Sequence, residues 1–391
     1  MKILYHHRTR GKRVEGVHIR SICKALEEKG HEVEIMAFPG SEAVETSNKL
    51  QDDKGSTLGR FLKSFTQYAP EFIFELMEMA YNFVVYYRIK KYIKKDKVDL
   101  IYERYSLFMY YTVKLARKNN IPVILEINDS ALVERVRHLF FVAIAKKFES
   151  WIFRNADGLV FISNEFKKIA STNYTLTNHM CVSPNAADPQ QFSRDKYDRR
   201  TIRKQLGIES GIVCGYVGAF HHWHGIHIFI DKVIPVMKKN PDTYMLMIGD
   251  GELLDDIKGI VEENHLQDKF IFTSRIPHDE VPHYIAAMDI AVLPDSNVYG
   301  SPMKIFEYMA MEVPVVAPDY SPIGEVIKSG ETGWLFHKND FNDCVQLFEK
   351  LLNDLDEIRR VGKNAREYII KERQWSNNAE DIIDMYARIK Q

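Results

Sequence analysis

Residues 301 to 307 combine the residue types that bind an anion. Ser301 and Pro302 are favoured at the N-cap and first position of a helix, so a helix should begin there. Its free N–H groups and positive dipole end would attract an anion such as a diphosphate. Lys304 adds a full charge in the first turn, and Glu307 on the same face could accept hydrogen bonds from vicinal hydroxyls. The alternative is a capped surface helix with a Lys304–Glu307 pair.

Histidines and cysteines are the residues to test for a metal site. His221, His222 and His224 lie within four positions, but no carboxylate lies close to them in the sequence. The four cysteines are far apart and lack the spacing of zinc ligands. We therefore predict no metal and free thiols in a reducing compartment.

Polar residues follow two expected strands in the first half, over 99–102 and 122–125. In open α/β sheets, ligands bind beyond the carboxyl ends of the strands, which makes these residues candidates for the acceptor side of a site. They are Glu103, Arg104, Glu126 and Asn128. Asp129–Ser130, which follows directly, is equally interpretable as a helix N-cap.

The start of the chain predicts a strand–helix–strand unit. Runs 2–5 and 33–37 are apolar, and the amphipathic stretch 17–29 between them ends at Gly30, a residue typical of a helix C-cap. Gly16, in the loop before this helix, either allows close approach of the backbone to an anion or is a plain turn glycine.

Two series of short apolar runs alternate with helical patterns, which predicts parallel strands with crossover helices. The runs of the first series are 2–5, 33–37, 99–102, 122–126 and 158–162, and those of the second are 212–217, 244–248, 269–272, 290–293 and 313–317. The turn-forming pair Pro184–Asn185 separates the series, so we expect a hinge near 185–195. The fold class is α/β, with two Rossmann-like halves facing across a cleft.

The composition of the 391 residues is that of an ordinary globular protein. It has 53 Lys and Arg against 54 Asp and Glu, 45% hydrophobic and 27% charged residues, and a net charge of −1. This excludes a disordered chain or a polycationic nucleic-acid arm. The N-terminus is too short and polar for a signal peptide, and no apolar run is long enough to span a bilayer, so we expect a cytoplasmic protein.

The segment 59–97 differs from the rest because it is rich in aromatic residues and ends in RIKKYIKKDK. Aromatic residues interleaved with lysines on helical segments suit a membrane interface. The other interpretation is that the apolar residues are core and the lysines are a solvated face.

Several motifs together resemble the retaining glycosyltransferases of the GT-B fold, family 4. SPMKIFEYMAMEVPVVAP followed by GEVIKSGETGWLF resembles the family's donor-binding segment. The resemblance continues, in order along the chain, through LEEKGHEVEIM, VSPNAADPQQF, GYVGAFHHWHGI, FIFTSRIPHDEVPHYIAAMDIAVLP and RQWSNNAEDIIDMYARI. It implies an acceptor-side domain over 1–187, a nucleotide-sugar donor domain over 188–372, and a last helix, 373–391, that returns to the first domain.

The resemblance also assigns roles around the donor. Glu307 matches the second glutamate of the family's Glu-x7-Glu signature, implied to bind the donor ribose, while the position of the first glutamate is Tyr299. A phenol cannot replace a carboxylate that accepts from sugar hydroxyls. The hexose is then expected to rely on backbone amides of Gly300, Ser301, Met303 and Lys304.

The resemblance also implies two positions where the family usually carries an Arg and a Lys that neutralise the diphosphate, and this sequence has other residues at both. Their places are Ala219 and His224, so Lys304 is expected to be the main phosphate cation, assisted by a histidine. Lys304, Glu307 and His224 are thus the expected catalytic residues. The donor site is also expected to include Gly16, Gly218 and His222, with Arg275 and Ile276 at the nucleobase.

The function implied is transfer of a hexose-type sugar, with retention, from a nucleotide-diphosphate donor to a glycan or lipid-linked acceptor in polysaccharide or glycolipid biosynthesis. A UDP-sugar is favoured as co-substrate, with no further cofactor and no nucleic-acid partner. The location expected is cytoplasmic, with a peripheral site on the inner face of the plasma membrane if 59–97 contacts lipid. The alternatives are a sugar-nucleotide-binding or scaffolding protein without turnover, motivated by Tyr299 and Ala219, and a GT-B nucleotide-sugar epimerase.

Overall fold

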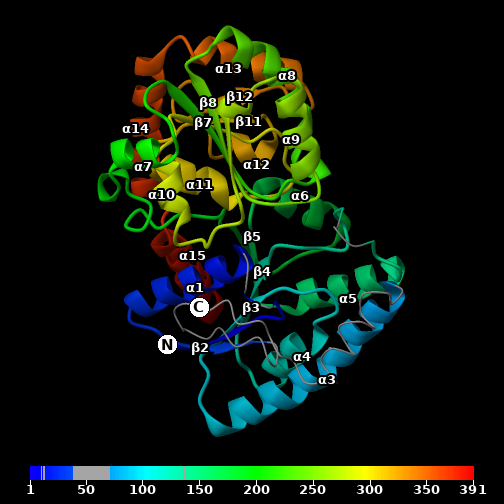
Figure 1. Cartoon of the computed structure of the whole chain (residues 1–391). Helices are drawn as coiled ribbons and strands as arrows, with labels where there is room; N and C mark the ends of the chain where they lie inside the picture. The colour runs from blue at the N-terminus through cyan, green and yellow to red at the C-terminus, as the bar shows by residue number, and fades with distance from the viewer. Residues whose placement is uncertain (10, 12–13, 38–70, 135–137) are drawn as a thin grey trace, which may run out of the picture. The chain divides into compact units, whose positions relative to one another are not determined.

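The computed structural model describes residues 1–391 apart from 10, 12–13, 38–70 and 135–137 (Figure 1). The part of the aromatic, basic segment that covers 59–70 therefore lies outside the described residues. The chain forms two compact units. Unit 1 comprises Met1–Ile162, Phe166–Ser183 and Ala379–Gln391, and unit 2 comprises Ser163–Glu165 and Pro184–Asn378.

Unit 1 is built on a parallel sheet whose described strands have the order β2-β1-β3-β4-β5-β6. The strands are β1 Lys2–His6, β2 Glu32–Met36, β3 Leu100–Arg104, β4 Val123–Ile127, β5 Gly158–Phe161 and β6 His179–Val182. The helices that connect or follow them are α1 Val14–Glu28, α3 Glu71–Lys95, α4 Tyr110–Lys118, α5 Val142–Asn155, α6 Asn164–Asn173 and α15 Trp375–Lys390. Gly30 follows α1 with a φ of 82°, which confirms the predicted glycine stop.

The end of the chain packs into unit 1. A Cβ on Gly158 in β5 would lie 2.3 Å from the sulfur of Met385 in α15, so the methionine side chain packs directly against this glycine in the sheet. Met385 is fully buried as a result. The last helix thus completes the core of the unit that begins at Met1.

Unit 2 repeats this architecture with the strand order β12-β11-β10-β7-β8-β9. The strands are β7 Ile212–Val217, β8 Thr243–Ile248, β9 Phe270–Thr273, β10 Ile290–Val292, β11 Val315–Pro318 and β12 Trp334–Phe336. The main helices are α7 Arg199–Gln205, α8 Ile226–Lys239, α9 Leu254–Glu263, α10 Val281–Ile285, α11 Met303–Ala310, α12 Ser321–Gly324, α13 Phe341–Leu351 and α14 Leu355–Glu372. Two Rossmann-like sheets are the fold class that the sequence predicts.

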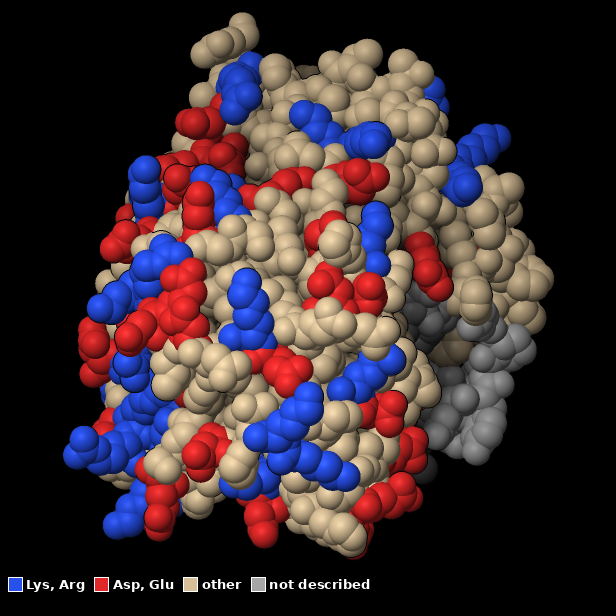
Figure 2. Space-filling view, turned by 90° about the horizontal axis from the view of Figure 1, so that it is seen from above, with Lys and Arg blue, Asp and Glu red and all other residues tan. Residues whose placement is uncertain are grey.

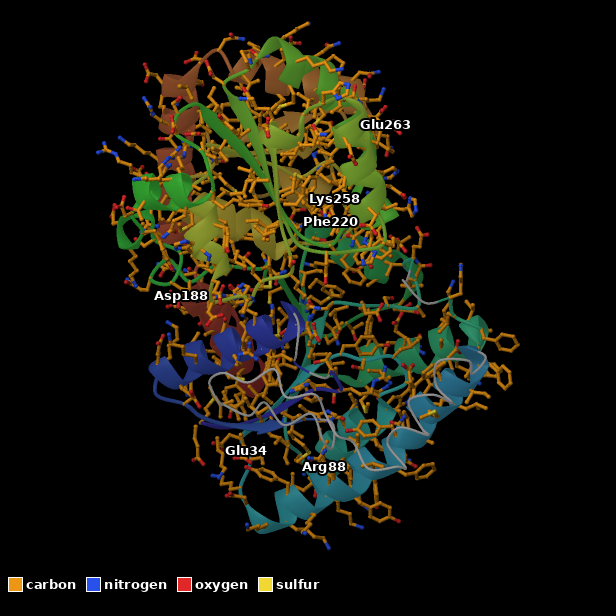
Figure 3. The ribbon with its side chains drawn as sticks, viewed as in Figure 1. Glu34, Arg88, Asp188, Phe220, Lys258 and Glu263 are labelled. Carbon is orange, nitrogen blue, oxygen red and sulfur yellow. The ribbon has the colours of Figure 1, made fainter. Side chains whose placement is uncertain are left out.

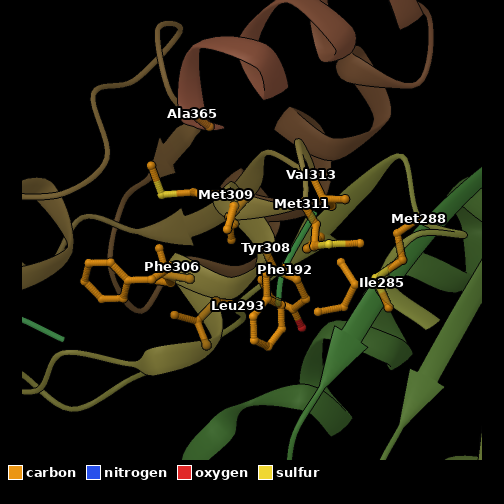
Figure 4. Packing of buried hydrophobic residues seen from close by; sticks show 14 of the residues in the cluster. Phe192, Ile285, Met288, Leu293, Phe306, Tyr308, Met309, Met311, Val313 and Ala365 are labelled. Carbon is orange, nitrogen blue, oxygen red and sulfur yellow. The ribbon is translucent and has the colours of Figure 1, made fainter. Parts of the chain in front are cut away.

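The core of unit 2 lies on both faces of its sheet, because successive strand side chains point to opposite faces. Val213 belongs to the cluster that includes α10, α11 and α14, whereas Cys214 belongs to the cluster that includes α8, α9 and α13. Figure 4 shows the first cluster, with Phe306, Tyr308 and Met309 of α11 inside it. Helix α11 is therefore a buried helix, and its interpretation as a surface helix is wrong.

Charges of both signs are interspersed over the face of the molecule shown in Figure 2. This distribution fits a net charge of −1 without a single-signed field over that face. Among the described helices, none has the length and apolar character needed to cross a membrane.

Candidate functional site

The predicted anion-binding helix exists but begins later than expected. Helix α11 starts at Met303 with Pro302 as its N-cap residue, and the side chain of Pro302 makes no capping hydrogen bond. The prediction that Ser301 is the cap is wrong, because its hydroxyl accepts a hydrogen bond from the backbone N–H of Asn185 at 3.0 Å. The amides of Met303 and Lys304 lie in the first turn, where no helical carbonyl precedes them as a partner.

Lys304 brings a positive charge into the interior beside this helix start. Its Nζ atom is buried and has no hydrogen-bond partner among the described residues. The ammonium lies over the ring of Tyr216, 4.6 Å from the centroid. Burial lowers the pKa of Lys304 to about 8, although the charge of Glu307 acts in the opposite direction. A buried ammonium with so little compensation is a natural partner for an anion.

The loop after β7 approaches Lys304 closely. A Cβ on Gly218 would lie 2.4 Å from Nζ, and the glycine has a φ of 154°. The Tyr216 hydroxyl donates to the carbonyl of Ala219 at 2.9 Å, which fixes the ring beneath the ammonium. Gly218 and Lys304, both expected in the donor site, are therefore brought together.

Glu307 has a partner that the sequence did not reveal. It is 6% exposed, and one carboxylate oxygen lies 2.7 Å from Nε2 of His278. The alternative of a Lys304–Glu307 pair is therefore wrong, since histidine takes that place. His278 lies in the loop after β9, two residues beyond Ile276, so its position in the expected base-binding loop was the available signal.

The histidine loop lies between β7 and α8. Burial, and then the positive charge of Lys304, lower the pKa of His224 to about 3, so this ring is neutral at pH 7. It can assist a phosphate only as a neutral hydrogen-bond donor. His222 is exposed, and its ring packs edge-on against His227 at 5.1 Å.

One of these histidines, His221, has a carboxylate neighbour that comes from another part of the chain. Glu252 lies 3.3 Å from Nδ1 of His221, because the turn before α9 returns to the end of β7. A pair is still not a metal site. Within the described residues, no group of three or more His, Cys, Asp or Glu is placed to hold a metal ion.

The remaining donor-side candidates lie on loops after β9 and β10. The carbonyl of Tyr299 accepts a hydrogen bond from the Ser163 hydroxyl at 2.7 Å. A Cβ on Gly300 would lie 2.2 Å from Oδ1 of Asn297, so the Asn297 side chain packs closely against this glycine. Arg275 is exposed, whereas Ile276 packs against the α11 side of the core.

Two of the acceptor-side candidates of unit 1, Arg104 and Asn128, contact a third, the buried carboxylate of Glu126. Arg104 and Asn128 donate to it, His18 lies 2.9 Å away, and the Tyr102 hydroxyl donates at 3.1 Å. Burial alone would raise the pKa of Glu126, but the charges of His18 and Arg104 outweigh it and hold the pKa well below its usual range. His18 was not predicted.

Glu103 and Gly16 both have roles that differ from those expected. Glu103 is fully buried and pairs with His6, the last residue of β1. Gly16 lies inside the first turn of α1, so its expected loop position is wrong. A Cβ there would lie 1.8 Å from the carbonyl oxygen of Gly11, so the close backbone approach is to the chain itself.

The interpretation of Asp129–Ser130 as a helix N-cap is also wrong. The Ser130 hydroxyl donates to Glu149 at 2.6 Å, and the next helix, α5, starts only at Val142. Glu149 is fully buried and also accepts from the hydroxyls of Tyr105 and Tyr174 at 2.9 and 2.8 Å. The hydrogen bond between Ser130 and Glu149 therefore anchors the loop after β4 to α5.

Comparisons with known proteins agree with this arrangement. The model described as glycosyl transferases group 1 matches residues 198–368, and that described as glycosyltransferase family 4 matches residues 16–191. The chain is 24% identical over 245 residues to the 2-deoxystreptamine glucosyltransferase of Streptomyces kanamyceticus, which covers 61% of this chain and 62% of that protein.

Two further proteins are similar over more of their length. The UDP-Gal:alpha-D-GlcNAc-diphosphoundecaprenol alpha-1,3-galactosyltransferase of Escherichia coli is 22% identical over 301 residues, 76% of this chain and 77% of that one. Anabaena HepE in complex with UDP has the same fold, with a TM-score of 0.73, 16% identity and coverage of 99% of this chain and 100% of that chain. The two Rossmann-like sheets and the two matching models together identify the chain as a glycosyltransferase of the GT-B fold.

Proposed function

We propose that this protein is a retaining glycosyltransferase that moves a hexose-type sugar from a nucleotide-diphosphate donor to a glycan or lipid-linked acceptor. The observation that carries the proposal is Lys304, whose buried ammonium has no hydrogen-bond partner in the described part of the chain. A diphosphate supplies the negative charge that this position lacks.

The residues of unit 2 fit the demands of the reaction. As the bond from the sugar to the diphosphate breaks, negative charge develops on the leaving phosphate, and fixed cations and helix N-termini lower that barrier most. Lys304 and the first amides of α11 provide both. Glu307, held by His278, is placed on the same helix one turn further on, where we assign it to the ribose hydroxyls. No residue is assigned as a nucleophile, and the donor is a co-substrate with no further cofactor.

The donor and acceptor are chosen by comparison. Anabaena HepE was crystallised with UDP, and the galactosyltransferase of Escherichia coli is named for a UDP donor and a diphosphoundecaprenol-linked acceptor. We therefore favour a UDP-sugar and a glycan or lipid-linked acceptor in polysaccharide or glycolipid biosynthesis. The buried network around Glu126, with Arg104, Asn128 and His18, is our candidate for the acceptor side in unit 1.

A panel of UDP- and GDP-sugars tests the donor assignment. A bound ligand raises stability by RT ln(1 + [L]/Kd), so the correct nucleotide should raise the melting temperature of the wild type more than that of Lys304→Met. Hydrolysis or transfer of a labelled sugar then shows turnover, and the anomeric configuration of the product shows retention. No thermal shift with any nucleotide would contradict the proposal.

A binding protein without turnover is the second candidate, and Tyr299 is the residue that favours it. Its phenol stands where a carboxylate would accept from sugar hydroxyls. Saturable UDP-sugar binding with no transfer and no hydrolysis would support this candidate. Interconversion of one UDP-sugar into another would instead indicate an epimerase.

We also propose that the protein works in the cytoplasm. All four cysteines are free, and Cys23, Cys214 and Cys344 are buried, as expected in a reducing compartment. Localisation of a tagged full-length chain by fractionation checks this.

A further inference from the structure

Helix α3 exposes one continuous side along its whole length. Its exposed residues recur every three or four positions and therefore form a single stripe, which we call the α3 stripe. In chain order they are Phe72, Leu76, Met77, Ala80, Phe83, Val84, Tyr87, Lys91, Lys94 and Lys95. Phe83 and Tyr87 are 60% and 69% exposed, which is unusual for such large rings. The stripe is apolar over its first turns and cationic at its end.

The start of α5 extends this apolar surface. Phe140, Val142 and Ile144 are 64%, 42% and 44% exposed. The rings of Phe72 and Phe140 lie 5.7 Å apart. The carboxylate of Glu75, on the buried side of α3, accepts hydrogen bonds from the backbone amides of Phe140 and Phe141. The two helices are therefore joined, and their exposed apolar side chains form one surface.

The described acidic side chains of the same helices do not add free negative charge to this surface. Glu75 is buried under it, Glu149 is buried in its own network, and Glu78 pairs with Arg8 at 2.8 Å. Every acidic residue of α3, α4 and α5 whose side chain the structure describes is thus buried or ion-paired. The exposed cations of the three helices are Lys91, Lys94, Lys95, Lys114, Arg117, Lys118, Lys146, Lys147 and Arg154. This one-signed charge differs from the mixed charges of the face in Figure 2.

Side chains project from the outer side of α3 and α5 in Figure 3, and the two helices lie near each other in Figure 1. Arg88, labelled in Figure 3, is not part of the stripe, because it donates to the carbonyl of Ala37. The stripe is thus the side of α3 directed away from the sheet of unit 1.

We infer that the α3 stripe and the start of α5 dock on the surface of a bilayer that contains anionic lipid. Aromatic and aliphatic side chains enter the boundary between headgroups and acyl chains, while the lysines reach lipid phosphates. Since no described helix can cross a membrane, α3 lies along the interface. The inference concerns a surface of unit 1 and is independent of the donor site proposed in unit 2.

A second copy of the chain is a poorer occupant for this surface. A two-fold contact places the same patch against itself, so the exposed lysines of one copy would face those of the other. Like charges brought together in a contact oppose association. An anionic lipid surface instead carries the charge opposite to that of the exposed lysines.

Co-sedimentation of the full-length chain with vesicles tests the inference. Phosphatidylcholine vesicles with about one-third phosphatidylglycerol should bind the wild type, and binding should fall when salt is raised, because electrostatic attraction is screened. Vesicles of phosphatidylcholine alone should bind much less. No binding to the anionic vesicles would overturn the inference.

Variants locate the surface. Phe83→Ser with Tyr87→Ser should lower the partition coefficient by at least about tenfold, through lost apolar burial. Lys91→Gln, Lys94→Gln and Lys95→Gln should lower it about fivefold each. The matched controls are Ile370→Ser, 45% exposed on α14, and a triple glutamine variant of the exposed Lys350, Lys363 and Lys371. These controls should bind vesicles like the wild type.

Two further readouts distinguish a lipid-binding surface from a folding defect and from a dimer interface. All variants should keep the thermal shift given by the donor nucleotide, so loss of vesicle binding with an intact shift supports the lipid surface. An equal loss of vesicle binding in the stripe variants and in the control variants would overturn the inference. So would a wild type that sediments as a dimer in solution and becomes monomeric on Phe83→Ser with Tyr87→Ser, because a second copy would then occupy the surface.

Discussion

At the scale of single residues, Lys304 is a buried lysine whose ammonium has no hydrogen-bond partner among the residues that the structure describes, and such a group destabilises the free protein. Its pKa of about 8 lies below the ordinary value of 10.5 because burial disfavours the charged form. A diphosphate bound at the proposed site would favour the charged form and raise this pKa. The proposed site therefore predicts that nucleotide binding and protonation of Lys304 are linked.

This linkage predicts a pH dependence of nucleotide binding. The Kd for UDP should be nearly constant between pH 6.5 and 7.5 and should rise about tenfold per unit above the pKa of about 8. Lys304→Met should bind weakly without that dependence. Calorimetric titrations at several pH values measure both, and a wild-type Kd that stays flat from pH 7 to 9.5 would show that Lys304 does not neutralise the phosphates.

The lowered pKa of Lys304 also makes the stability of the free protein depend on pH. Between about pH 8 and 10.5 the unfolded chain holds a proton on this lysine that the free folded protein has lost. Stability rises with pH wherever the unfolded state binds more protons. The unfolding free energy of the wild type, measured relative to that of Lys304→Met, should therefore increase over this window in urea denaturation without nucleotide.

His278 is predicted to position Glu307 for the ribose. Removing a hydrogen bond to a carboxylate costs about 1.5–3 kcal/mol, so His278→Ala should weaken UDP binding by tenfold or more, and His278→Gln should restore part of it. Titration with 2′,3′-dideoxy-UDP gives the control, since it lacks the hydroxyls assigned to Glu307. An equal loss for UDP and dideoxy-UDP would mean that His278 acts only on the fold.

At the scale of elements, two helical glycines allow a matched comparison. A Cβ on Gly16 in α1 would lie 1.8 Å from a backbone oxygen, whereas a Cβ on Gly259 in α9 meets nothing within 4 Å. Gly16→Ala should destabilise the protein by about 1–3 kcal/mol through overpacking. Gly259→Ala should stabilise it by about 0.5–1 kcal/mol through helix propensity. Urea denaturation measures both, and effects of the same sign would contradict the close packing of α1.

Interior strands were predictable from the sequence because buried parallel strands are continuous apolar runs. β7 was predicted at its observed bounds, and β1, β3 and β4 to within a residue or two. Missing from the prediction were β6 and β12, which lie at sheet edges and have only four and three residues. β10 is as short as β12 but was predicted, because its three residues are all buried and Leu293 extends the apolar run.

Residues of the candidate site could be predicted only where they lie in a recognisable local sequence segment. Lys304 and Gly218 stand in recognisable segments, and the structure brings them together. The cap was misplaced because Asn185, far away in the chain, binds Ser301. His278 and His18 were missed for the same reason, since their partners Glu307 and Glu126 are supplied by other elements. Tertiary contacts decide such pairs.

At the scale of the whole molecule, the chain returns to its first unit after completing its second. Met385 of α15 is fully buried against Gly158 of β5. Met385→Ala should lower the stability of unit 1 by about 2–5 kcal/mol, because it leaves a cavity in that core. Nucleotide binding, assigned to unit 2, should persist. Thermal denaturation with and without UDP checks this, and loss of binding by a folded Met385→Ala protein would contradict the assignment.

The most direct test asks whether Lys304 holds a nucleoside diphosphate. Lys269 provides the control, since its ammonium lies 4.4 Å from the centroid of the Tyr244 ring in the same unit, much as Lys304 lies over Tyr216. Calorimetric titration with UDP at pH 7 should show tight binding by the wild type and by Lys269→Met, and loss of at least about tenfold in affinity by Lys304→Met. Equal affinity of all three proteins for UDP would contradict the proposed donor site.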